Sequence, residues 1–260
     1  MIEEIRAYYD SHDEDGRFLP KHGRVEFLTT MRYIERYLKP GARVCEIGAG
    51  TGRYSHEIAR MGYRVDAVEL VEKNIEIFRA HTRAWENVTI AQGDARDISF
   101  LPDGAYDVTL LLGPMYHLFT EKDKRAALSE AVRVTKRGGI LMVAYCVADP
   151  SVLMHGFIRG NIHSLIEIGL VDPETFHASS RPQEVFELHR KEDIDRLMAD
   201  FPTERLYYIA TDLYTRHMDG AVDAMDEETF ELYVKYHLTI CERPDMVGLS
   251  HHTLDIRRKE

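Results

Sequence analysis

The segment VCEIGAGTG, residues 44–52, has the residue types and spacing that most clearly suggest chemistry. Gly48, Gly50 and Gly52 follow an apolar, strand-like run and precede a helix-like one. Glycine lets a backbone turn sharply and lets a ligand approach where a Cβ would stand in the way. The spacing therefore predicts a ligand-binding turn between a strand and a helix.

Two neighbouring residues indicate which ligand this turn would hold. A dinucleotide fingerprint places a third glycine three residues after the second, and that position is Arg53 here. Glu46 ends the strand, and a carboxylate there suits an ammonium or a sulfonium group better than a diphosphate. The charge pattern thus favours S-adenosylmethionine over NAD, and a NAD-dependent oxidoreductase remains a weak alternative.

Acidic residues also follow the next two predicted strands. Glu69 ends the strand VDAVEL, 21 residues after Gly48, where a carboxylate can accept hydrogen bonds from both ribose hydroxyls. Asp94 and Ala95 come after the third strand, in GDARDI, with Asp97 as a turn residue. The plain alternative for Glu69 is a surface carboxylate at a helix start, where acids are favoured.

With these motifs in order, the chain resembles the class I S-adenosylmethionine-dependent methyltransferases of the small-molecule type. The resemblance implies that the turn binds the amino-acid part of the cofactor, that Glu69 binds the ribose, and that Asp94 and Ala95 contact the adenine. It also implies S-adenosylhomocysteine as the product. The implied cofactor residues are Glu46, Gly48, Ala49, Gly50, Gly52, Glu69, Leu70, Asp94, Ala95 and Leu112.

The acceptor side is predicted from LLLGPMYHLF, residues 110–119, at the end of the fourth strand. The Pro and Tyr of this loop faintly resemble an Asp/Asn-Pro-Pro-Tyr base-amine clamp, but Gly113 lacks the side chain that holds the amine. Tyr116 and His117 are the catalytic candidates, because ligands bind at the carboxyl ends of such strands and histidine titrates near neutrality. The alternative for His117 is a packed residue at a helix start.

Five further residues are weaker candidates for contact with the acceptor. Tyr8 and Tyr9 could belong to an N-terminal lid over the cofactor, or to an ordinary helix face before a solvated acidic loop. The others are Tyr145, His155 and Arg159. The acids and histidine at 10–15 show no metal-ligand spacing, so no metal site is expected.

The pattern of elements predicts the architecture. Strands alternate with helices from residue 24 to residue 147, which is typical of a doubly wound α/β fold with a mostly parallel, seven-stranded, Rossmann-like methyltransferase sheet. We expect one domain over 1–260. Its parts are N-terminal helices or a lid over 1–40, a cofactor-binding core over 41–148, a helical cap insertion over 151–185, and a C-terminal part over 190–260 that completes the sheet.

Bulk composition narrows the function. The net charge of −11, from 44 acids against 33 bases, does not favour a nucleic-acid partner, since such binding relies on Lys and Arg. The sequence shows neither an apolar leader nor a membrane span, so a cytoplasmic monomer or homodimer is expected. The predicted activity is methyl transfer to a small organic acceptor. Methylation of RNA or protein, and a non-catalytic cofactor-binding module, remain the alternatives.

Overall fold

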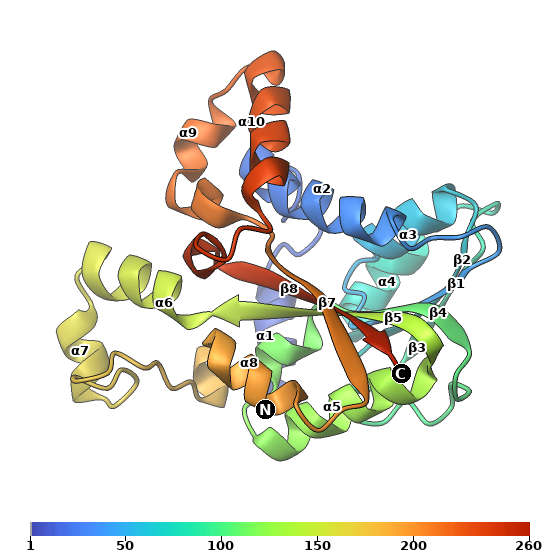
Figure 1. Ribbon diagram of the computed structural model, residues 1–260, viewed down its shortest axis with the longest axis horizontal. Coiled ribbons are helices and arrows are strands. Elements are labelled where there is room, and N and C mark those ends of the chain that lie inside the picture. Colours follow the sequence, from blue (N-terminus) through green and yellow to red (C-terminus); the bar gives the residue numbers. More distant parts are fainter. Residues whose placement is uncertain (1) are drawn as a thin grey trace.

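One sheet runs through the centre of the computed structural model, which describes residues 2–260 (Figure 1). Met1, the first residue of the predicted N-terminal part, lies outside the described residues. The strands are β1 (Arg43–Ile47), β2 (Arg64–Glu69), β3 (Val88–Gln92), β4 (Tyr106–Leu111), β5 (Thr135–Val147), β6 (Leu188–His189), β7 (Thr203–Ala210) and β8 (His252–Lys259). Their order is β3-β2-β1-β4-β5-β8-β7, and the two-residue β6 pairs with β5 beside this path. The sheet is therefore the predicted one with a short eighth strand.

The order of the strands reverses between β1 and β4. The chain first builds outward from β1 to β2 and β3, and then returns to place β4 on the other side of β1, with Val44 opposite Val108. β1 to β5 are parallel, whereas β8 runs antiparallel to β5 and to β7. In open α/β sheets, ligands bind at the carboxyl ends of the strands that flank such a reversal. The expected binding crevice therefore lies at the carboxyl ends of β1 and β4.

Helices cover both faces of the sheet (Figure 1). α2 (Lys21–Glu35) and α3 (Arg53–Arg60) share one apolar cluster with the strands, while α5 (Glu121–Val134) and α8 (Lys191–Met198) share the other. α4 (Glu72–His81) connects β2 to β3. Parallel strands that are covered on both faces are buried at successive positions, and β1, β4 and the second part of β5 are buried at almost every residue.

Side-chain alternation along β5 decides which residues face the cofactor crevice. Ala144 and Cys146 belong to the cluster under α2 and α3, whereas Val143 and Tyr145 belong to the cluster under α5 and α8. This alternation follows from the two-residue period of a strand. Tyr145, predicted as an acceptor contact, is therefore fully buried on the opposite face, where its ring packs 5.2 Å from that of His189.

Two segments lie outside the alternating core. α1 (Ile2–Ser11) precedes the first core helix, and α6 (Ala148–Ser151), the π-helical η2 (Val152–Ile158) and α7 (Ile162–Glu167) follow β5. Helices occupy the first half of residues 151–185. The second half is mainly irregular, with the short η3 (Pro182–Glu184) and a bridge between Val171 and Ala178. Within residues 2–260, no helix is both long and apolar enough to cross a membrane.

The C-terminal elements complete the sheet. α9 (Asp219–Asp223) and α10 (Glu227–Ile240) lie between β7 and β8, after the 3-10 helix η4 (Leu213–His217). The start of α10 is fixed by Asp226, whose carboxylate accepts a hydrogen bond from the Thr229 N–H at 2.7 Å. The helix α2 begins directly after Pro20.

Candidate active site

A cavity of about 990 Å³ opens at the carboxyl ends of β1, β2 and β4. Its walls continue onto α1, the end of β5, the 151–188 segment and the turns around Thr211 and His252. The predicted residues that line it are Tyr8, Tyr9, Glu46, Gly48, Ala49, Gly50, Glu69, Leu70, Asp94, Ala95, Leu112, Tyr116, His117 and His155. One cavity thus contains most of the predicted cofactor residues and most of the predicted acceptor residues.

The glycine turn after β1 is held close to the β4 loop. Gly48 has a φ of 77°, and its N–H donates to the Val68 carbonyl at 2.8 Å. A Cβ on Gly48 would lie 2.5 Å from Cδ of Pro114, which begins the 3-10 helix η1 (Pro114–His117). Gly52 instead faces the protein, since a Cβ there would lie 2.4 Å from the Phe78 ring. Gly52 therefore shapes the start of α3 and does not line the cavity.

Glu69 connects the turn to the end of β2. One carboxylate oxygen accepts from the Gly50 N–H at 2.9 Å, and the other accepts from the Val71 N–H at 2.9 Å. Burial raises the pKa of Glu69, although these backbone donors favour the ionised form. A carboxylate has about four lone-pair sites, so the two oxygens keep capacity for hydroxyl donors in the cavity.

Glu46 is a second acid in the same wall, and its side chain is 1% exposed. Ser55 donates a short hydrogen bond to it. Burial raises the pKa of Glu46 to about 8, and the nearby charge of Glu69 acts in the same direction. A buried carboxyl with this pKa retains its proton at neutral pH until a cation lies beside it.

Asp94 lies after β3 and already has a partner. The Arg96 guanidinium contacts it at 2.6 Å, and the Arg96 N–H donates to it at 2.9 Å. Burial alone would raise the pKa of Asp94, but the hydrogen bonds and charge of Arg96 outweigh burial and lower it. The carboxylate is thus fixed in its ionised form on the cavity wall beside Ala95.

His117 is hydrogen-bonded through both ring nitrogens. Nδ1 lies 2.8 Å from the Val185 carbonyl oxygen, and Nε2 lies 2.9 Å from the Tyr9 hydroxyl. A carbonyl can only accept, so Nδ1 carries the hydrogen and Nε2 accepts from Tyr9. Burial lowers the pKa of His117, so the ring is neutral and Nε2 keeps its lone pair at neutral pH.

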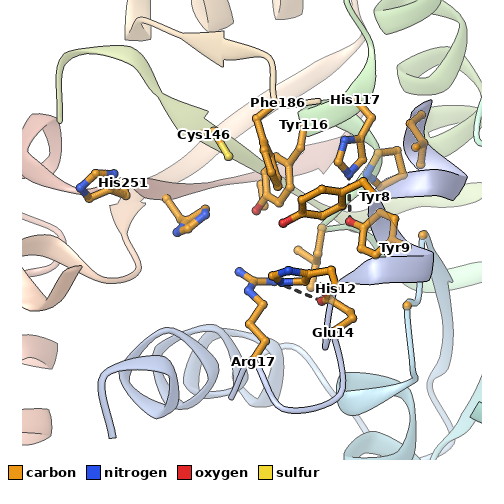
Figure 2. A pocket seen from close by; sticks show the side chains of 18 of the residues that line it. Tyr8, Tyr9, His12, Glu14, Arg17, Tyr116, His117, Cys146, Phe186 and His251 are labelled. Carbon is orange, nitrogen blue, oxygen red and sulfur yellow. Dashed lines mark hydrogen bonds and ion pairs between the residues drawn. The ribbon is translucent and has the colours of Figure 1, made fainter. Parts of the chain in front are cut away.

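The helix α1 lies over this part of the cavity. Lys73 of α4 donates to the carbonyls of Tyr9 and Asp10 at 2.9 and 2.8 Å, which attaches the end of α1 to the cofactor side. Tyr8 packs edge-on against Phe186 with ring centres 5.3 Å apart. Figure 2 shows Tyr8, Tyr9, His117 and Phe186 gathered at one part of the cavity, with His251 across from them.

Two of the predicted acceptor contacts lie elsewhere. Tyr145 faces the opposite side of the sheet, and Arg159 follows η2 and approaches His155 Nδ1 at 3.3 Å from the exposed surface of the cap. Neither side chain lines the cavity. Sequence reasoning did not select several residues that also line the cavity, namely Glu14, Arg17, Cys146, Phe186, Arg216, His251 and His252.

The fold and the site resemble those of one class of protein. A doubly wound sheet with β8 antiparallel beside β5, a glycine turn after β1, and carboxylates at the ends of β1 and β2 are features of the class I S-adenosylmethionine-dependent methyltransferases. Residues 44–139 match the family described as a methyltransferase domain. This match covers the chain from β1 into the start of β5, the part of the sheet that carries the glycine turn, Glu69 and Asp94.

Individual relatives are distant. A glycine/sarcosine N-methyltransferase of Aphanothece halophytica is 23% identical over 180 residues, which cover 68% of this chain and 63% of that protein. A ubiquinone biosynthesis O-methyltransferase of Caulobacter vibrioides is 30% identical over 146 residues, which cover 51% of this chain and 56% of that protein. The chain thus spans less than two thirds of the length of each of these curated relatives.

A solved structure matches over nearly the whole chain. The magnesium protoporphyrin IX methyltransferase of Synechocystis, determined with bound S-adenosylhomocysteine, has a TM-score of 0.57 and 15% identity. The match covers 99% of this chain and 94% of that one. At 15% identity, this likeness concerns the fold alone.

Proposed function

We propose that this protein transfers a methyl group from S-adenosylmethionine to a small organic acceptor. The observation that supports this most directly is the cavity that runs from the glycine turn to the Tyr9–His117 pair and is partly covered by α1 and the 151–188 segment. A covered cavity suits a small acceptor, whereas a nucleic acid or a protein needs an open groove. Removal of water from the site also helps to align the acceptor for displacement.

The cavity residues fit the cofactor. We assign the ribose hydroxyls to Glu69, the ammonium end to the Gly48–Gly52 turn and Glu46, and the adenine to Asp94 and Ala95. The buried acids in the wall suit a ligand that is cationic at one end, because a positive charge relieves the cost of their burial. When bound, the cofactor supplies a methyl group on a sulfonium leaving group.

We assign the proton transfer to His117. An acceptor hydroxyl or ammonium must lose a proton as its heteroatom forms the new bond to carbon. Nε2 of His117 is the unprotonated ring nitrogen, and it accepts a hydrogen bond from the Tyr9 hydroxyl, which belongs to a residue that also lines the cavity. The acceptor proton passes to the Tyr9 oxygen as the Tyr9 proton passes to Nε2, and Val185 keeps the ring in the required tautomer. Tyr116 forms the adjoining wall.

The function is tested by cofactor binding and by product formation. We expect calorimetry to detect S-adenosylhomocysteine binding and no NADH binding. Incubation with methyl-labelled S-adenosylmethionine and a panel of phenols, amines, thiols and small acids should label at least one acceptor. Cofactor binding with no labelled product on any acceptor, RNA or protein would identify a non-catalytic module instead.

Glu69→Gln is expected to weaken S-adenosylhomocysteine binding by roughly tenfold. The substitution removes the charge that strengthens hydrogen bonds to ribose hydroxyls, and its amide N–H₂ would face the Gly50 or Val71 N–H. Calorimetry measures the effect. Glu72→Gln is the matched control, since the Glu72 side chain is 54% exposed at the start of α4. Equal affinity in both variants would refute the ribose assignment.

Binding of S-adenosylmethionine is expected to release a proton. Glu46 is protonated below its pKa of about 8, and a cationic ligand beside it favours the carboxylate. The affinity should therefore rise with pH by at most about tenfold per unit below pH 8. Calorimetry in buffers of different ionisation enthalpy counts the proton. Glu46→Gln should abolish the release, and an unchanged proton count in that variant would contradict the assignment.

A further inference from the structure

The acceptor end of the cavity carries one arginine without a counter-ion. Four arginines line the cavity. Arg17 contacts Glu14 and Glu26, Arg96 contacts Asp94 and Asp123, and Arg53 lies over the Phe27 ring at 5.2 Å. The Arg216 side chain is exposed where it lines the cavity, and it has no hydrogen bond, ion pair or ring contact with any residue from 2 to 260.

The neighbouring imidazoles add hydrogen-bonding groups to the same wall. His252 Nδ1 lies 2.7 Å from a carboxylate oxygen of Asp212, which leaves Nε2 as the ring nitrogen without a partner among the described residues. The carboxylates of Glu26 and Asp212 outweigh burial and raise the pKa of His252, so Nε2 carries a hydrogen that it can donate. Nε2 of His251 is buried and likewise has no hydrogen-bond partner in the described chain.

A buried network fixes the position of this wall. Ser250 Oγ donates to Asp212 at 2.5 Å and accepts from the Leu213 N–H at 2.9 Å, which joins the start of η4 to the start of β8. Leu213 has a φ of 43°, a conformation that a non-glycine side chain adopts only at a cost. This network thus fixes His252 and the start of η4, the helix that carries Arg216, despite local backbone strain.

Two of the four cavity arginines, Arg53 and Arg216, contact no carboxylate of the described residues, and of these two only Arg216 also lacks a ring contact. Asp212 neutralises His252, and Glu26 neutralises Arg17. Arg216 also lies near enough to His155 and His251 for its charge to lower their pKa, after the larger effect of burial. A guanidinium presents a planar pair of donors that matches a carboxylate.

The space between this wall and His117 is apolar and aromatic. The ring centre of Tyr116 lies 6.3 Å from that of His117 and 5.8 Å from that of His252, so a small molecule along Tyr116 can reach both imidazoles. The apolar residues that line the same cavity include Val152, Leu165, Leu170, Phe186 and Leu188.

We propose that the acceptor is a small organic acid, whose carboxylate binds Arg216 and His252 while its apolar body lies along Tyr116 with the methylated heteroatom toward Tyr9 and His117. This inference rests on the proposed methyltransferase function and specifies its substrate class. It makes Arg216 a specificity-determining residue.

The test compares acids with their neutral amides. Calorimetry on the full chain saturated with S-adenosylhomocysteine would use 4-hydroxybenzoate against 4-hydroxybenzamide, 4-aminobenzoate against 4-aminobenzamide, and 3-phenyllactate against its amide. We expect at least one acid to bind roughly 10- to 100-fold more tightly than its amide, as a charge-assisted pair allows. Arg216→Gln should remove this preference, whereas Arg216→Lys should retain part of it. Arg137→Gln, an exposed site at the amino end of β5, should retain all of it.

The outcomes separate this inference from the proposed function. Failure to bind S-adenosylhomocysteine refutes the methyltransferase function itself. Cofactor binding with no acid preferred over its amide, or with no acid bound, overturns the acid-acceptor inference alone. A preference that survives in Arg216→Gln, or an equal loss of acid and amide binding in that variant, also overturns it.

Discussion

Replacing Gly48 by alanine is expected to weaken S-adenosylhomocysteine binding by roughly 100-fold or more. The new Cβ would lie 2.5 and 2.7 Å from the Pro114 ring, so either the turn after β1 or the η1 loop must move. The φ of 77° adds backbone strain of about 1 kcal/mol or more for any side chain. Because the turn and the loop both line the cavity, either displacement alters the cofactor site. Calorimetry measures the affinity, and thermal unfolding shows whether the chain is still folded.

Gly62→Ala separates backbone strain from steric overlap. Gly62 has a similar positive φ of 92°, but a Cβ there would meet no atom within 4 Å. We expect this control to lower the unfolding temperature slightly and to leave cofactor affinity unchanged. If Gly48→Ala binds the cofactor as well as Gly62→Ala does, the turn after β1 is not part of the cofactor-binding site.

His117→Gln is expected to reduce kcat by roughly 100- to 10,000-fold on an acceptor that must lose a proton. Glutamine has no nitrogen that can accept a proton near neutral pH, although its amide can still contact Val185 or Tyr9. The affinity for S-adenosylhomocysteine should stay within about twofold, because none of the proposed cofactor contacts involves this residue. An unchanged kcat would refute the assignment of the base.

Tyr9→Phe tests the relay between acceptor and imidazole. Removal of the hydroxyl that lies 2.9 Å from His117 Nε2 should lower kcat, while Tyr8→Phe, which keeps that hydroxyl, should lower it far less. In the wild type saturated with S-adenosylmethionine, kcat/KM for the acceptor should fall only as the pH drops below about 6.5, since burial lowers the pKa of His117 and the base acts in its neutral form. An acid limb above that pH would indicate a different base.

The grouping of the proposed cofactor residues in one cavity was predictable from sequence, because these residues follow successive strands. Glu46, Gly48 and Glu69 stand at strand ends that a parallel sheet brings to one edge, so local patterns determine their arrangement. The acceptor half depends on contacts between segments that are distant in sequence. His252 Nδ1 lies 3.5 Å from a carboxylate oxygen of Glu26, although more than 200 residues separate the two in sequence. No local pattern indicates that pairing.

Tyr145 shows where residue type misled the prediction. An aromatic hydroxyl near the end of β5 looks suitable for a pocket, but the alternation of the strand assigns that face to Ala144 and Cys146. The information was present in the sequence as the two-residue period. The sequence alone does not show which face of the sheet each alternate β5 residue takes. That became clear only from the packing of α2 against one face and α5 against the other.

The placement of Arg216 and His252 has a practical consequence for redesign. The wall proposed to recognise the acceptor comes from η4 and the start of β8, whereas the proposed proton path comes from α1 and the loop after β4. Chemistry and selectivity therefore reside on separate stretches of the chain. A library that varies residues 211–217 can search for new acceptors while leaving the residues of the transfer step untouched.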